Sequence, residues 1–329
     1  MCLHGVVEMT NYFLISVSNK ENLELCKKYA LAGFTDSING VWTFCEIETG
    51  DFISFLYAAK AHNLYRVEKK LAFKDAENLP PWKPVTFKIS GKTYHFPFRL
   101  HLRPIRKFEE PLIRAEFAYV AENLLLRGGY RKTHFQADQT TLQNVSQMGE
   151  KFLGYVENIE FSSLTFTPEF SLNKSLVKIP YVFPFREVIL QSVIRHFLCN
   201  KENLQKFLED ISVDEVKAEN LEVLGEKALP EGHIDIFVKE AIPIGESKNI
   251  IIEIKAGRAV TKDFEQLESY LREFGPECVR AVLIAKDFSR KAIFNFRNKT
   301  VPLKYALSCD LSRPRNFKEL VESMNLGKC

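Results

Sequence analysis

The sequence predicts a two-domain protein, an α+β first half built on a small curved sheet or barrel and an α/β second half. The chain has 329 residues, about twice the usual length of one domain. Short strands that enclose few helices fill the first half, which is typical of a small curved sheet or barrel. In the second half, strands alternate with amphipathic helices.

The composition is that of an ordinary globular protein, with 46% apolar and 26% charged residues. It excludes a disordered chain, a collagen-like repeat and a small disulfide scaffold. A net charge of only +3 argues against a protein that binds nucleic acid through bulk positive charge. The seven cysteines are scattered without a Cys-x-x-Cys pair, so we expect reduced thiols and no zinc knuckle.

The N-terminal residues contain a short apolar run but no basic leader and no small-residue cleavage site. No stretch of the sequence approaches the ~20 apolar residues that cross a membrane. We therefore expect a cytoplasmic protein without a membrane partner.

The first half concentrates positive charge in a segment rich in aromatic residues and strands. Residues 60–107 hold 12 basic and three acidic residues, so the small net charge hides a local basic surface suited to a nucleic-acid backbone. Ser90-Gly91 is typical of a hairpin turn. We expect helices at 21–31 and 111–126 on either side of this segment.

Residues 166–184 are rich in proline and serine and lack a clear period, which predicts a connection between domains. The sequence then predicts a helix at 185–198, strands at 221–229, 233–238 and 249–254, a helix at 263–274 and a strand at 279–285. We expect domains at 1–165 and 185–329.

Two strands of the second half carry charged residues that are expensive to bury. Asp235 lies in the middle of one apolar strand, and Glu253 and Lys255 lie two residues apart in the next, so the last two project from one face. Such groups need a partner or a metal ion. Carboxylates from neighbouring strands suit Mg²⁺, and a lysine beside them suits phosphodiester hydrolysis by a metal-activated water. A buried ion-pair network is the structural alternative.

The text GHIDI…IEIKAG…QLESY resembles the PD-(D/E)xK nuclease superfamily, closest to the branch of archaeal mismatch-type and Holliday-junction-type endonucleases. The resemblance implies a restriction-endonuclease-like αβ core that uses Mg²⁺, with Mn²⁺ as a substitute. It implies metal ligation by Asp235, Glu253, the backbone carbonyl of Ile254 and an additional Glu187. It also implies catalytic or positioning roles for Lys255, Gln266 and Tyr270.

The text NYFLISVSNKENLELCKKYALAGF…NGVWTF resembles the YTH/EVE group of PUA-like domains over about residues 11–106. The resemblance implies a barrel that holds a modified nucleobase between aromatic walls. The GVWT segment is expected to enter a strand. By position, the base-binding residues are Trp42 and Trp82 as walls, Asn22 at the base edge, and Ser18 and Thr43 as further contacts.

A base must leave its stack before such a cavity can hold it, at a cost of a few kcal/mol, and aromatic stacking returns ~1–3 kcal/mol. The glycine pair and basic residues at 127–136 suit a loop that enters a DNA groove, and a solvated loop is the alternative. The DNA contacts expected there are Arg127, Tyr130, Arg131 and Lys132.

Together these features predict a modification-dependent restriction endonuclease that flips a methylated base, N6-methyladenine by the YTH resemblance, in double-stranded DNA. Cutting both strands needs two active sites, so we expect a homodimer. No P-loop is present, so no nucleoside triphosphate is expected. The alternatives are a repair endonuclease that senses mismatched or damaged bases, a non-catalytic binding module, and an RNA-directed reader.

Overall fold

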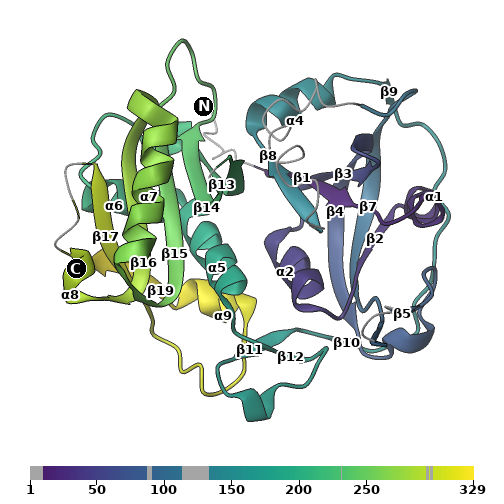
Figure 1. The fold of residues 1–329 in the computed structure, drawn as a ribbon. Helices are drawn as coiled ribbons and strands as arrows, with labels where there is room; N and C mark the ends of the chain where they lie inside the picture. Colours follow the sequence, from purple (N-terminus) through teal and green to yellow (C-terminus); the bar gives the residue numbers. More distant parts are fainter. Residues whose placement is uncertain (1–9, 87–90, 113–132, 231, 294–295, 297–298) are drawn as a thin grey trace, which may run out of the picture.

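The computed structural model describes residues 10–86, 91–112, 133–230, 232–293, 296 and 299–329. Within them the chain is a mixed α+β protein with one large sheet in each half (Figure 1). The N-terminal half comprises residues 10–165, and the C-terminal half comprises residues 185–329. The expected helix at 111–126 falls almost wholly outside the described residues.

The N-terminal sheet has eight strands, of which six form a continuous path. All neighbours are antiparallel except β1 and β3. In the described part of the chain, the end strands β2 and β8 do not pair with each other, so a closed PUA-like barrel is not shown. The path runs β2 (Leu31–Phe34), β7 (Phe98–Lys107), β4 (Lys60–Phe73), β3 (Phe52–Tyr57), β1 (Tyr12–Ser16) and β8 (His134–Ala137), while β9 (Glu150–Lys151) pairs with β7 and β10 (Thr165–Phe166) with β4.

The helices of this half are α1 (Lys20–Tyr29), α2 (Ile38–Glu46) and α4 (Gln139–Ser146). The expectation of a strand at GVWT is wrong, because these residues lie in α2. The Ser37 hydroxyl caps the helix by accepting from the Gly40 amide at 3.1 Å. Every residue from Gly40 to Glu46 is buried, and a helix segment buried on all sides shows no apolar period that separates it from a buried strand.

A small hairpin lies outside the large sheet. Strand β5 (Val85–Thr86) pairs with β6 (Thr93–Tyr94) in antiparallel register. The expected turn at Ser90-Gly91 falls between these strands, but Ser90 lies outside the described residues.

The C-terminal sheet has six strands in the order β13-β14-β15-β16-β17-β19. Its centre, β15 to β17, is parallel, and the outer pairs are antiparallel. The strands are β13 (Leu221–Leu229), β14 (Gly232–Glu240), β15 (Asn249–Ala259), β16 (Cys278–Phe288), β17 (Thr300–Leu307) and β19 (Met324–Lys328); the helices are α5 (Glu187–Cys199), α6 (Lys201–Asp210), α7 (Thr261–Phe274), α8 (Arg290–Ile293) and α9 (Phe317–Glu322). The predicted elements of this half are confirmed, with ends that differ by up to five residues.

Both faces of this sheet are covered, which explains the nearly continuous apolar strands. Ile236 and Ile252 pack in the cluster that contains the α5 side chains. Phe237 and Ile251 alternate with them and pack in the cluster that contains Leu267 of α7. The two clusters hold α5 and α7 on opposite faces.

The expected connection at 166–184 is ordered rather than a bare linker. Strands β11 (Glu169–Ser171) and β12 (Val182–Pro184) form a three-stranded sheet with β18 (Arg315–Asn316). Phe170 and Phe183 are fully buried in the large core. Short 3₁₀ helices occupy Ala76–Asn78, Lys174–Leu176, Ala218–Asn220 and Gly275–Glu277. No helix in the described ranges is long and apolar enough to cross a membrane.

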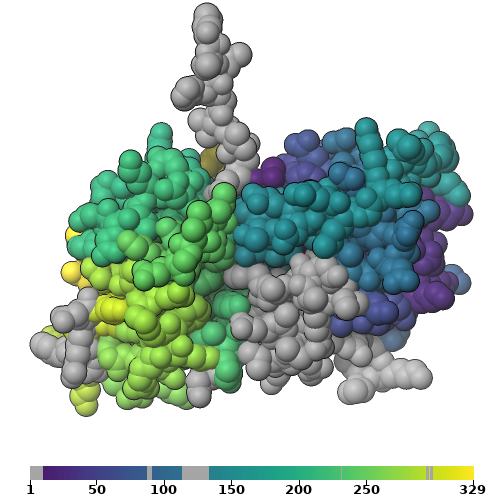
Figure 2. All heavy atoms as spheres, turned by 90° about the horizontal axis from the view of Figure 1, so that it is seen from above, coloured from purple at the N-terminus to yellow at the C-terminus, as the bar shows by residue number. Residues whose placement is uncertain are grey.

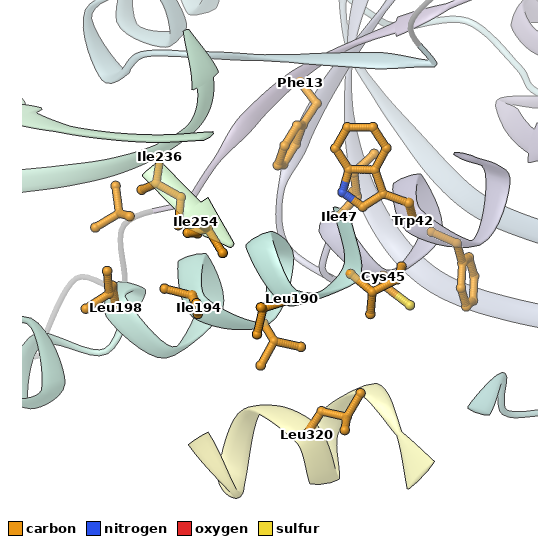
Figure 3. Close-up of a cluster of buried hydrophobic side chains, with 14 of the residues drawn as sticks. Phe13, Trp42, Cys45, Ile47, Leu190, Ile194, Leu198, Ile236, Ile254 and Leu320 are labelled. Carbon is orange, nitrogen blue, oxygen red and sulfur yellow. The ribbon is translucent and has the colours of Figure 1, made fainter. Parts of the chain in front are cut away.

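One hydrophobic cluster contains side chains of both halves. Figure 2 shows the two halves side by side, with their atoms in contact along the boundary. Phe13 and Trp42 from the N-terminal half lie in the same cluster as Leu190 and Ile194 of α5 (Figure 3). Leu320 of α9 joins the cluster from the other side of α5. Burial of apolar surface therefore joins the halves as well as stabilising each of them.

A buried ion pair crosses this boundary. The Arg195 guanidinium on α5 donates through Nε to a carboxylate oxygen of Glu46 on α2, and through Nη2 to the Glu46 carbonyl at 3.1 Å. The second Glu46 carboxylate oxygen accepts from the Ser192 hydroxyl, and Ser192 Oγ accepts from the Trp42 indole at 2.7 Å. Arg195 is 1% exposed, so its charge depends on Glu46 for compensation.

Replacing Glu46 by glutamine is expected to lower the free energy of unfolding by about 3–5 kcal/mol, because it leaves the Arg195 charge buried without its counter-charge. Denaturant titration measures the loss. The same substitution at Glu322, which pairs with Lys318 at 3.7 Å on the surface, is the control and should change nothing measurable. An E46Q protein as stable as the wild type would contradict the role of the pair.

Burial and then the charge of Arg195 lower the pKa of His134 from 6.5 to about 3. Its ring lies edge-on to Trp42 at 4.7 Å between centroids, and Nδ1 is 2.9 Å from the Thr43 hydroxyl. The folded state therefore keeps His134 neutral below pH 6.5, where the unfolded chain becomes protonated. Stability from this group is complete above pH 6.5 and is lost as the pH falls toward 3.

We expect the free energy of unfolding of the wild type to fall relative to that of H134N by about 1.4 kcal/mol per pH unit below pH 6.5. Denaturant titrations of both proteins at pH 8, 6 and 5 measure the difference. The pH 8 values serve as the baseline, because there the histidine is neutral in both states. A difference that is constant from pH 8 to 5 would contradict the burial of a neutral His134.

Candidate functional site

Two strands of the C-terminal sheet bring the predicted carboxylates and lysine together. The β14–β15 ladder ends at the pair Ile236 and Ile252, and the next residue on each strand is Asp235 or Glu253. The Lys255 ammonium donates to Glu253 Oε1 at 2.8 Å. We call Asp235, Glu253 and Lys255 the carboxylate–lysine centre.

Asp235 is held by hydrogen bonds to both carboxylate oxygens. The Ile254 amide, beyond the end of the β14–β15 pairing, donates to Oδ2 at 2.7 Å. The Gln191 side chain on α5 donates to Oδ1 at 2.6 Å. These two donors fix the direction in which the carboxylate faces.

Glu253 is the most buried member of the centre, with 2% of its surface exposed. One carboxylate oxygen accepts from Lys255, while Oε2 has no hydrogen-bond partner among the described residues. A buried acceptor without a partner is rare and costs free energy. Its position beside a second carboxylate suits a cation.

The pKa shifts of the carboxylate–lysine centre also favour a bound cation. Burial raises the pKa of Asp235 well above its ordinary value, and the neighbouring charge of Glu253 raises it further. Burial likewise raises the pKa of Glu253. For Lys255, burial alone lowers the pKa, but the charge of Glu253 outweighs it and the pKa lies above its ordinary value. The carboxylates thus repel each other and would be stabilised by additional positive charge.

The remaining predicted residues surround the centre. Glu187, at the start of α5, accepts from the Ala256 amide at 2.8 Å. On α7, Gln266 donates to the Tyr270 hydroxyl at 2.6 Å, and this hydroxyl accepts from the His233 amide at 3.1 Å. Gly232 allows this approach, because a Cβ at that position would lie 2.4 Å from Tyr270 Oη.

The described residues do not form a ready-made metal cluster. No group of three His, Cys, Asp or Glu side chains within them converges closely enough to hold a metal ion. Glu187 and Asp235 accept from the backbone, and Glu253 accepts from Lys255. Among the described residues, Glu253 Oε2 and the side-chain oxygen of Gln191 are the buried acceptors of this region without a partner. Oxygen acceptors of this kind fit a hard cation, while Glu253 is paired with Lys255 in this structure.

The N-terminal half contains a cavity of about 370 Å³ with an aromatic lining. Three predicted base-binding residues, Ser18, Asn22 and Trp82, line it. The Asn22 amide donates to the Ser18 hydroxyl at 3.2 Å, so these two polar groups already contact each other. The other aromatic lining residues are Phe34, Phe55, Tyr94 and Phe96.

Trp42 and Thr43 do not line this cavity. Trp42 is packed at the boundary of the two halves, where its indole donates to Ser192. The Thr43 hydroxyl lies 2.5 Å from the hydroxyl of Thr133, and Thr133 lines the cavity. Thr43 is therefore connected to the cavity through Thr133. The expected two-tryptophan sandwich is therefore not formed, because helix α2 turns Trp42 into the shared core.

The expected DNA contacts Arg127, Tyr130, Arg131 and Lys132 lie outside the described residues.

Sequence reasoning missed two side chains that the structure joins to these sites. Gln191, which donates to Asp235, follows Glu187 by four residues on α5, and this spacing on a helix places both on one face. Arg99 lies against Trp82, with its guanidinium carbon 4.5 Å from the ring centroid. Its strand position carried no signal of this contact.

Comparison with protein-family models gave no match, and no curated protein matched. Among solved structures, the chain is similar to the EndoMS–dsDNA2 complex, with 22% identity over 28% of this chain and 38% of that chain, at a TM-score of 0.20. It is also similar to the MspJI restriction endonuclease in complex with a 27-mer oligonucleotide, with 9% identity over 88% of this chain and 64% of that chain, at a TM-score of 0.17. The chain thus spans less than two thirds of either protein.

Replacing Gly33 by alanine is expected to displace Trp82, because the added Cβ would lie 2.4 Å from both Trp82 Cζ3 and Arg99 Nη1. Overpacking of this kind costs about 1–3 kcal/mol. In a W42F background Trp82 is the single tryptophan, and its fluorescence emission should shift to longer wavelength as the ring becomes exposed. G327A is the control, since a Cβ there meets open space. Unchanged emission in G33A would contradict the packing described.

Proposed function

We propose that the protein is a Mg²⁺-dependent DNA endonuclease that cuts double-stranded DNA near a modified base. The observation that carries the proposal is the carboxylate–lysine centre, in which a half-buried and a buried carboxylate, both with raised pKa values, lie beside a lysine. One oxygen of the buried carboxylate has no partner among the described residues. Perturbed titratable groups gathered in one place are typical of a reaction centre. The PD-(D/E)xK resemblance of the same residues supports this assignment.

Asp235, Glu253 and the backbone carbonyl of Ile254 would hold Mg²⁺, or Mn²⁺ in its place, with Glu187 as a further ligand. When bound, the ion would lower the pKa of a water molecule and offset charge on the phosphate. Lys255 would leave Glu253 and hold the attacking water or a phosphate oxygen. Gln191, as well as Gln266 and Tyr270, are positioning residues: Gln191 fixes Asp235, while the Gln266–Tyr270 pair fixes the start of β14 through the His233 amide.

The aromatic cavity would receive the flipped base. Its volume is in the range of small-molecule sites, and Trp82 offers a ring for stacking while Ser18 and Asn22 offer hydrogen bonds to a base edge. The YTH/EVE resemblance of this half supports a PUA-like reader and favours N6-methyladenine. Trp82, rather than Trp42, is the wall that we assign to the base.

Residues 1–165 would form the reader domain, residues 166–184 the connection and residues 185–329 the nuclease domain. A homodimer would supply two carboxylate–lysine centres for the two strands. Reader and nuclease would act without a nucleoside triphosphate, in the cytoplasm.

Incubation of the full chain and Mg²⁺ with matched duplexes tests the proposal. We expect cleavage of a duplex with N6-methyladenine and little cleavage of unmethylated, mismatched or abasic duplexes or of methylated RNA. D235N should reduce cleavage by at least about 100-fold, because it removes one of the carboxylates that hold the ion. D214N, an exposed Asp→Asn change in the same half, should cleave as the wild type does.

The same panel separates the two tryptophans. W82A should lose the preference for methylated DNA, whereas W42F should keep the preference and lose stability. Cleavage by D235N at the wild-type rate would contradict the assigned centre. Cleavage that is equal with and without methylation would contradict the reader, and preferential cleavage of mismatched or abasic duplexes would favour a repair endonuclease.

A further inference from the structure

Arg99 on β7 is a buried cation without a counter-charge among the described residues. Its side chain is fully buried, and Nε and Nη1 have no hydrogen-bond partner within that part of the chain. The Nη2 atom donates to the Pro80 carbonyl at 3.4 Å. No ion pair within the described ranges includes Arg99, so its charge is balanced mainly by the Trp82 ring over which it lies at 4.5 Å.

A buried guanidinium of this kind lowers the stability of the folded state. An isolated charge in the interior is among the most unfavourable groups to bury, and native structures leave few buried donors without partners. Burial lowers the pKa of Arg99 to about 9, which leaves the guanidinium positively charged at neutral pH. The side chain therefore keeps a positive charge that is shielded from bulk solvent and has no ion-pair partner among the described residues.

The charge lies directly behind the wall of the aromatic cavity. Arg99 does not line the cavity, but Trp82 and Gly33, which it contacts, both do. The Trp82 ring thus contacts the guanidinium and also lines the cavity. The lining residues in the described part of the chain include polar and aromatic side chains but neither a carboxylate nor a cation.

We propose that Arg99 makes the cavity selective for uncharged heterocycles and excludes cationic ones. This inference rests on the proposed reader function and narrows its ligand class to neutral modified bases, as opposed to bases that alkylation at a ring nitrogen has made positive. An aromatic cavity usually favours cations through the negative face of its rings. Here Arg99 already occupies a face of the principal ring and repels a second positive charge.

The expected size of the effect is given by Coulomb's law. A base stacked on Trp82 would lie roughly 8 Å from the guanidinium, and at an effective dielectric constant of about 20 the repulsion corresponds to about a 30-fold loss of affinity for a cationic base. The two bases also differ in how well their shapes fit the cavity. The contribution of the Arg99 charge is therefore measured as the change in the ratio of their affinities when that charge is removed.

Two isomeric bases provide the test. N6-methyladenine is neutral at pH 7, whereas 1-methyladenine, which carries its methyl group on a ring nitrogen, binds an additional proton and is a cation. Single-stranded oligonucleotides that carry either base once, or neither, are compared by fluorescence anisotropy, because single strands remove differences in base pairing. The wild type should prefer the N6-methyl strand, and R99M should shift the ratio of the two affinities toward the cationic isomer by about 10- to 30-fold.

Matched variants distinguish charge from structure. R99K keeps a positive charge and should keep the wild-type ratio, and R99Q is a second neutral variant that should behave as R99M does. R103M removes an arginine from the same strand whose side chain is 52% exposed and pairs with Glu68, and it should keep the ratio. Because R99M removes an unpaired charge, its melting temperature should equal or exceed that of the wild type.

An unchanged ratio in both R99M and R99Q, with a preserved preference for the N6-methyl strand, would overturn the role of Arg99 and leave the reader standing. A wild type that binds neither modified strand better than the unmodified one would overturn the reader itself and the role of Arg99 with it.

Discussion

The ion pair between Glu46 and Arg195 is the interaction on which the arrangement of the two halves depends. The apolar cluster around it contains side chains from both halves, but apolar contacts are non-directional and would tolerate more than one packing. The guanidinium and the carboxylate accept far fewer geometries, since Arg195 binds both the side chain and the carbonyl of Glu46. A buried pair adds little net stability over an apolar substitute. We interpret its contribution here as orientation, because an uncompensated charge would penalise every other docking.

Helix α5 contacts both the N-terminal half and the carboxylate–lysine centre. Its later residues, Ser192 and Arg195, bind the N-terminal half. One and two turns earlier, Gln191 donates to Asp235 and Glu187 accepts from the Ala256 amide next to Lys255. Residues four apart on a helix lie near one face, so a single rigid element connects the boundary of the halves to the strands of the centre. A shift of α5 at the boundary would therefore move the donor that fixes Asp235.

The sequence predicted those parts of the structure that local pattern determines. Apolar residues in 233–238 and 249–254 predicted strands, and the two-residue spacing placed Glu253 and Lys255 on one side, because strand geometry alone sets that relation. The position of Trp42 was not predictable in this way. A tryptophan in an apolar run suits a cavity wall and a core equally well. Trp42 lies in the core, where its indole donates to Ser192, 150 residues away in the sequence. Gln191 and Arg99 were missed for the same reason, since their partners come from other elements.

The unsatisfied polar groups of the fold are concentrated at the two candidate sites. Five buried side-chain nitrogen and oxygen atoms lack a partner in the described part of the chain. Two belong to Arg99 beside the aromatic cavity, and two belong to Gln191 and Glu253 at the carboxylate–lysine centre. Each lowers stability where an apolar group would not. The fifth is Nε2 of His101, two residues from Arg99 on β7. Four of the five thus belong to side chains at or next to the two candidate sites, where a bound ligand could supply the missing partners.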